Sequence, residues 1–90
     1  MRILLIEDDA ETAEYIASGL GQGGPHRIEI ESDGAKGLER ALQGGFDLLI
    51  VDRMLPKKNG LELVGAVRAA GVATPILFLT ALGAIEDRVA

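Results

Sequence analysis

The chain lacks cysteine and tryptophan and is poor in aromatic residues, with one tyrosine and two phenylalanines among its 90 residues. Without cysteine it has neither a disulfide framework nor a thiolate nucleophile. The single histidine, His26, has no second histidine to form a zinc pair with. No apolar run approaches the roughly 18 residues needed to cross a bilayer, and the run at residues 3–6 is too short for a signal peptide. We expect a cytoplasmic protein of at most one domain.

Positive charge is also scarce. The chain has 9 Lys and Arg residues against 14 Asp and Glu residues, which gives a net charge of −5. This balance argues against a segment that grips nucleic acid or an anionic membrane by itself.

Apolar runs alternate with helical patterns along the chain. Strands are expected at residues 2–6, 27–31, 47–51 and 76–79. Helices are expected at residues 10–20, from Ser32 or Asp33 to about 43, from Asn59 to before Gly71, and in first turns over 85–90. This alternation predicts right-handed crossovers and a parallel sheet. Residues 27–31 alternate polar with apolar and therefore belong at an edge, which favours a flavodoxin-like α/β fold with strand order 2-1-3-4.

Helical periodicity also predicts which side chains face the sheet. For the second helix these are Ala35, Leu38, Ala41 and Leu42, and for the third they are Leu61, Val64 and Val67.

Acidic residues follow two of the predicted strands at the point where each strand ends. Glu7 and Asp8 follow the first, and Asp52 follows the third. Adjacent parallel strands would bring these carboxylates together at the carboxyl edge of the sheet, where ligands bind in such folds. Clustered carboxylates repel one another, and Mg²⁺ held by carboxylates usually also holds a phosphate. The pattern predicts Mg²⁺-dependent phosphoryl chemistry on an aspartate.

The alternative is that acids after strands only cap helices, since Asp is a favoured N-cap residue. That would account fully for Asp9. It accounts poorly for Asp52, because Pro56 and Gly60 precede the next helix.

Two further positions complete the predicted site. Pro56 and Gly60 shape a loop that can aim the main-chain carbonyl of Met54 at the cation, although an ordinary connection would look the same. Thr80 follows the fourth strand as Asp52 follows the third, so its hydroxyl can donate to a phosphoryl oxygen on Asp52. The alternative for Thr80 is a β-favouring residue that finishes a strand.

Three segments together resemble the response-regulator receiver domain of bacterial two-component systems. They read ILLIEDD at residues 3–9, D-x-M-L-P-x-x-x-G at 52–60 and LTA at 79–81. Receivers joined to winged-helix DNA-binding domains are the most similar. The resemblance implies a CheY-like fold with Asp52 as the phosphoacceptor and Thr80 as the switch hydroxyl. It also implies a Mg²⁺ site formed, partly through water, by Glu7, Asp8, Asp52 and the Met54 carbonyl.

The resemblance further implies partners and a role. A sensor histidine kinase would supply phosphate from a phosphohistidine, a homodimer is expected, and DNA would be bound only through a C-terminal effector domain outside these residues. The chain would then be a signalling domain in transcription regulation that assists its own phosphotransfer, not an enzyme.

The chain departs from the family pattern at its end. The family's fifth strand and helix, with a conserved lysine and an aromatic switch residue, have no counterpart before Ala90. Residues 1–90 are therefore expected to form an incomplete receiver domain, with the fourth strand as an unpaired edge that favours self-association.

Two other functions compete with this interpretation. A Mg²⁺-dependent phosphohydrolase could form an aspartyl-phosphate on a related α/β fold. Hydrolases of the haloacid dehalogenase type, however, place a second acid two residues after the nucleophile, where this chain has Met54. The complete acidic set argues against an interaction module that is never phosphorylated.

Overall fold

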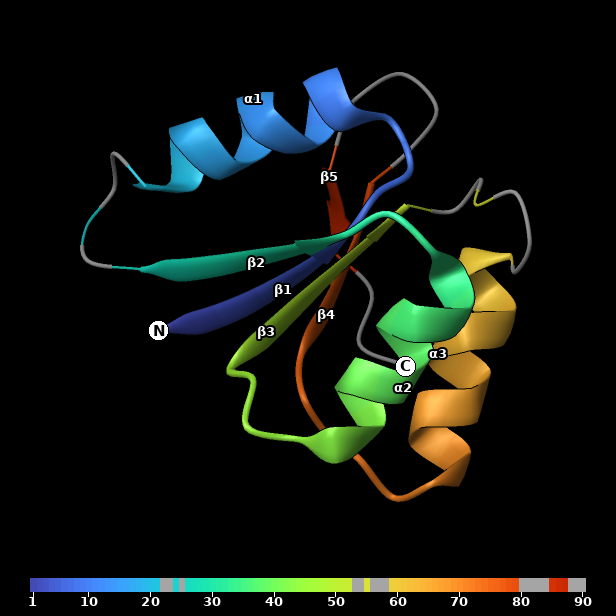
Figure 1. Ribbon diagram of the computed structural model, residues 1–90. Helices are drawn as coiled ribbons and strands as arrows, with labels where there is room; N and C mark the ends of the chain where they lie inside the picture. The colour runs from blue at the N-terminus through green and yellow to red at the C-terminus, as the bar shows by residue number, and fades with distance from the viewer. Residues whose placement is uncertain (22–23, 25, 53–54, 56–58, 80–84, 88–90) are drawn as a thin grey trace.

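The computed structural model describes residues 1–21, 24, 26–52, 55, 59–79 and 85–87, and all structural statements below concern these residues. Five strands form one sheet with the order β2-β1-β3-β4-β5, and helices cover both of its faces (Figure 1). The elements are β1 (Arg2–Ile6), α1 (Ala10–Gly21), β2 (Arg27–Glu31), α2 (Gly34–Gln43), β3 (Leu48–Asp52), α3 (Gly60–Ala69), β4 (Ile76–Leu79) and β5 (Ile85–Asp87).

The first four strands form a parallel sheet. β1 lies between β2 and β3, and β4 pairs with the other side of β3. The predicted order 2-1-3-4 and the flavodoxin-like fold are confirmed. β3 begins one residue later than predicted. Asp47 lies just before it, where its side chain accepts a hydrogen bond of 2.7 Å from the Arg2 N–H and its own N–H donates to the Arg2 carbonyl at 2.7 Å.

The helix predicted at residues 85–90 is wrong over 85–87, where the structure has β5. This short strand pairs antiparallel with β4 over residues 77–79. A single turn of helix is unstable in water, whereas pairing with β4 satisfies backbone groups along an apolar edge. The edge of β4 that was expected to be bare is therefore paired, so it does not favour self-association as predicted.

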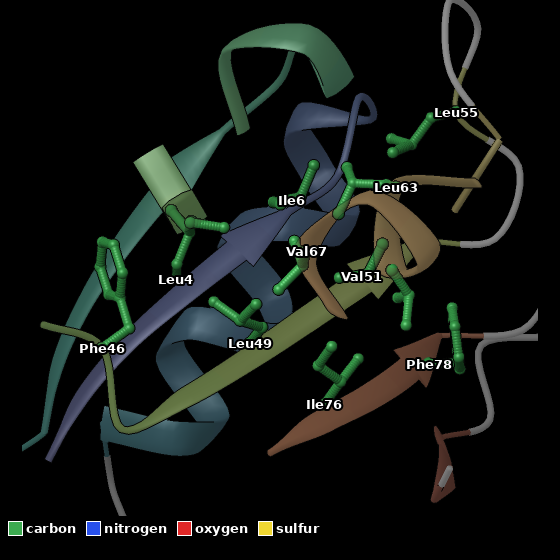
Figure 2. Packing of buried hydrophobic residues seen from close by; sticks show 12 residues of the cluster. Leu4, Ile6, Phe46, Leu49, Val51, Leu55, Leu63, Val67, Ile76 and Phe78 are labelled. Carbon is green, nitrogen blue, oxygen red and sulfur yellow. The ribbon is translucent and has the colours of Figure 1, made fainter. Parts of the chain in front are cut away.

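The larger core lies between the sheet and the α2–α3 layer. Figure 2 shows side chains from the sheet and from α3 meeting there. The sheet contributes Leu4, Ile6, Leu49, Val51, Ile76 and Phe78, and α3 contributes Leu63, Val64 and Val67. These strand residues alternate with those on the opposite face, as the pleat of a strand requires.

The smaller core lies under α1, which among the described helices is the one that covers the opposite face of the sheet (Figure 1). Its buried residues are Ile3, Leu5 and Ile50 from the sheet and Ala13 from α1. Because both faces of β1 and β3 are covered, residues 3–6 of β1 and 48–51 of β3 are all apolar. The acids at the carboxyl ends of these two strands are therefore held in fixed places.

Glycine sets how α2 packs on β1. Gly34, Gly37 and Ala41 are the buried residues of α2, while the predicted inward residues Ala35 and Leu42 are exposed. A Cβ at Gly37 would lie 2.8–2.9 Å from three carbons of the Ile6 side chain. The backbones of α2 and β1 therefore approach closely. The face of α2 that packs on the sheet is the one that carries its glycines.

The third helix shows a smaller difference from the prediction. Val64 and Val67 are buried as expected, together with Leu63, but Leu61 is exposed.

We predict that Gly37→Ala destabilises the protein by about 1–3 kcal/mol, the usual cost of overpacking. Ile6 is fully buried and β-branched, so it cannot rotate away from the new methyl group. Gly65→Ala in α3 is the matched control, because nothing lies within 4 Å of its added Cβ. The control is expected to gain about 0.5–1 kcal/mol from helix propensity. Equal unfolding free energies for the two variants in urea would contradict the packing argument.

Candidate functional site

The register of the sheet brings three acids together. Ile6 is paired with Val51 between β1 and β3, so Glu7 follows that pair on one strand and Asp52 on the other. One carboxylate oxygen from each of Glu7, Asp8 and Asp52 lies within 4.8 Å of the others. Glu7 is 3% exposed and Asp52 9% exposed, whereas Asp8 is exposed. The expected cluster at the carboxyl edge is therefore present in the structure.

Backbone hydrogen bonds hold Glu7 in this position. Its N–H donates to the carbonyl of Glu31 at 3.1 Å, which continues the pairing of β1 with β2. Its Oε1 accepts a hydrogen bond of 3.0 Å from the N–H of Asp9. Its Oε2 is buried and receives no donor from any described residue.

The pKa of Glu7 is raised to about 7, chiefly by burial and next by a hydrogen bond with Asp52. The N–H of Asp9 acts in the opposite direction, and the negative charges of Asp52 and Asp8 add to the increase. The protonated form of Glu7 can donate to Asp52, so a proton is one way to relieve the crowding of charge.

A hard divalent cation can also relieve the repulsion among these carboxylates. Magnesium prefers carboxylate oxygens and usually takes only one or two of them from the protein. The buried Oε2 of Glu7 is a free acceptor of this kind, and the partly open position of Asp8 leaves room for water. The donor set therefore fits a magnesium ion.

Asp9, next to this cluster, caps α1. Its Oδ2 accepts from the N–H of Thr12 at 3.1 Å and from the Thr12 hydroxyl, and its carbonyl accepts from the N–H of Ala13 at 2.9 Å. The hydrogen bonds from Thr12 hold the pKa of Asp9 below its usual value. Helix capping, the alternative considered for the acids, is therefore correct for Asp9. The hydrogen bond that the N–H of Asp9 donates to Glu7 could not be predicted from residue spacing.

Two predicted site residues, Met54 and Thr80, lie outside the described residues. Leu79 precedes Thr80 and pairs with Asp52 between β3 and β4. The roles of Met54 and Thr80 stay predictions.

A hollow of about 460 Å³ lies beside the cluster. Its lining comprises Asp9, Glu11, Thr12, Tyr15 and Ile16 from the start of α1, with Leu79 from β4. Sequence reasoning missed this feature. The one available signal was the chain's sole tyrosine, Tyr15, on the polar side of a helix, where it is 83% exposed.

Within the described part of the chain, no helix has the length and apolarity that a membrane crossing requires.

Comparison with known proteins agrees with this architecture. The response regulator receiver domain family matches residues 3–90. The transcriptional regulatory protein CusR of Escherichia coli K12 is 43% identical over 89 residues, which are 99% of this chain and 39% of CusR. The transcriptional regulatory protein DltR of Streptococcus agalactiae is 44% identical over 89 residues, again 99% of this chain and 39% of the relative. The chain thus spans 39% of the length of these curated relatives.

A solved structure is similar to this chain in both fold and sequence. Response regulator protein TrrA of Thermotoga maritima, in complex with Mg²⁺-BeF, has a TM-score of 0.82 at 31% identity and is matched over 89% of this chain and 69% of its own. Because the family matches from residue 3 to residue 90, the chain belongs to the response regulator receiver domain family.

Proposed function

We propose that this receiver domain accepts a phosphoryl group on Asp52 in a Mg²⁺-dependent reaction. The observation that carries the proposal is the meeting of Glu7, Asp8 and Asp52 within 4.8 Å at the carboxyl edge of the sheet. The complex of the relative TrrA with Mg²⁺-BeF supports it, since beryllium fluoride attached to a carboxylate oxygen is tetrahedral and negatively charged, as a phosphoryl group is.

Each residue has a distinct part in this proposal. A carboxylate oxygen of Asp52 attacks the phosphorus of a phosphohistidine, the P–N bond breaks, and its electron pair returns to the imidazole. The product is an acyl phosphate on Asp52. Glu7, Asp8, Asp52 and the Met54 carbonyl would hold the ion. Magnesium supplies neutralisation of the charge on the phosphoryl oxygens when it is bound. Thr80 donates to a phosphoryl oxygen and moves toward it as a switch.

The proposed setting follows from the family and its relatives. A sensor histidine kinase would donate the phosphate, and the domain would act in the cytoplasm. The relatives CusR and DltR are named transcriptional regulatory proteins and are longer than this chain, which supports control of DNA through an effector domain beyond these residues. The domain would assist its own phosphotransfer without turnover.

A Mg²⁺-dependent phosphohydrolase is the second candidate, because the same three carboxylates would serve it. Met54, in place of a second acid two residues after Asp52, speaks against it, as does the family match.

We predict that acetyl phosphate and Mg²⁺ add one phosphoryl group, about 80 Da, to the protein. Asp52→Asn should abolish the adduct, because the amide is not a nucleophile, whereas the surface control Asp47→Asn should keep it. Intact-mass spectrometry measures both. An equal adduct on the Asp52→Asn variant would overturn the assignment, and release of phosphate without any adduct would favour the hydrolase.

We also predict that the metal-free protein loses stability as the pH rises from about 4.5 to 7. The pKa of Glu7 is about 7 in the folded protein against an ordinary value of 4.5. Folding therefore favours the protonated form, whose contribution is complete below pH 4.5 and is lost as Glu7 ionises. The expected loss is about 3 kcal/mol in the free energy of unfolding, from about 1.4 kcal/mol per pKa unit.

Urea unfolding in EDTA across this pH range measures the loss, and Glu7→Gln is the control that should remove it. The pKa values of Asp9 and Glu29 are lowered, so their contributions are lost only at more acidic pH and do not mask the effect. Above pH 7, Mg²⁺ at a hundredfold excess over its Kd should restore about 2.7 kcal/mol. Identical pH profiles for the wild type and Glu7→Gln would show that Glu7 is not the group that titrates.

A further inference from the structure

The N-cap of α1 is joined to the acidic cluster by a continuous chain of hydrogen bonds. The backbone N–H and the hydroxyl of Thr12 both donate to Oδ2 of Asp9. The Asp9 carbonyl accepts the first hydrogen bond of the helix, from Ala13. The N–H of Asp9 in turn donates to Oε1 of Glu7 at 3.0 Å. Asp9 is therefore held by its side chain and its carbonyl while its N–H points at a carboxylate of the site.

These hydrogen bonds determine which carboxylate oxygen of Glu7 lacks a donor. Oε1 has the N–H of Asp9 as its donor, while the buried Oε2 has no donor among the described residues. If the cap were lost, the first turn of α1 would loosen and the N–H of Asp9 would move. Glu7 would then have two buried oxygens without donors and a strong tendency to change rotamer.

We propose that Asp9 and Thr12 are positioning residues, which through the N–H of Asp9 hold the Glu7 carboxylate in the orientation that binds the cation. The inference rests on the proposed Mg²⁺ site and names a support for it. Residues that orient a ligand by a hydrogen bond typically change metal affinity when they are replaced. α1 thus has two tasks, to cover one face of the sheet and to hold a ligand of the site.

Two simpler explanations make different predictions. Asp9 could act only as a fourth negative charge that attracts the cation, in which case Asn would be as damaging as Ala. Asp9 could also act only as a helix cap, in which case removal of a cap elsewhere would have the same effect. Asn caps helices about as well as Asp, and Asp33 caps α2 through the N–H groups of Ala35 and Lys36. The chain therefore offers a control for each explanation.

The experiment is titration of Mg²⁺ by calorimetry into the wild type, Asp9→Asn, Asp9→Ala and Asp33→Ala at a pH above 7, with thermal unfolding in EDTA alongside. Asp9→Ala should weaken Mg²⁺ binding roughly tenfold, while Asp9→Asn and Asp33→Ala stay within about twofold of the wild type. Asp9→Ala and Asp33→Ala should lower the melting temperature in EDTA by similar amounts, because each removes one cap.

Thr12 supplies an independent pair of variants if Asp9→Ala does not fold. Thr12→Val keeps the shape of the side chain but removes the hydroxyl that donates to Asp9, and Thr12→Ser keeps the hydroxyl. Thr12→Val should weaken Mg²⁺ binding several-fold, and Thr12→Ser should restore it.

Two results would overturn the positioning role and leave the site intact. One is an equal Mg²⁺ affinity in Asp9→Ala and Asp33→Ala. The other is Mg²⁺ binding by Asp9→Asn that is as weak as binding by Asp9→Ala. A wild-type protein that neither binds Mg²⁺ in the calorimeter nor is stabilised by it would overturn the proposed site and this role together.

Discussion

Two carboxylates, those of Glu7 and Asp52, are buried side by side at the carboxyl ends of neighbouring strands, and the arrangement at this edge depends on how their charge is relieved. Glu29 shows the contrast within the same sheet. It is paired with Arg2 at 2.7 Å and with Arg40, and the hydrogen bond from Arg2 lowers its pKa. Glu7 has no cationic partner in the described part of the chain, and burial raises its pKa instead. An acid with an arginine partner is a stabilising element, whereas an acid without one is suited to bind a cation or a proton.

The fold keeps these charges in place by apolar packing on both sides of β1 and β3. Ile6, the residue before Glu7, is fully buried against α2, where Gly37 leaves room for it. Val51, the residue before Asp52, is buried in the same core. Because neither strand end can shift without disturbing a close-packed interior, the carboxylates cannot move apart to relieve their repulsion. The core therefore fixes the geometry that the proposed chemistry requires.

The strand positions, the sheet order and the meeting of the three acids could be predicted, because apolar runs and their end points depend only on local sequence. The features that were not predicted depend on contacts between residues that are distant in the sequence. The stripe of α2 was misassigned because Gly37 is buried for its contact with Ile6, which no periodicity reveals. β5 was expected to be helical because its pairing with β4 is a tertiary interaction. The raised pKa of Glu7 and the hydrogen bond that it accepts from Asp9 follow from burial and backbone direction, which are visible only in the folded chain.

The most direct test of the central claim, that these three carboxylates form one cation site, is an anomalous diffraction map of crystals soaked with Mn²⁺ above pH 7. Manganese takes the same oxygen ligands as magnesium and is visible by its anomalous signal. The account predicts a single strong peak within coordination distance of carboxylate oxygens from Glu7, Asp8 or Asp52, directly or through one water. A map with no peak at this edge of the sheet under saturating Mn²⁺, or with its strongest peak elsewhere, would contradict it.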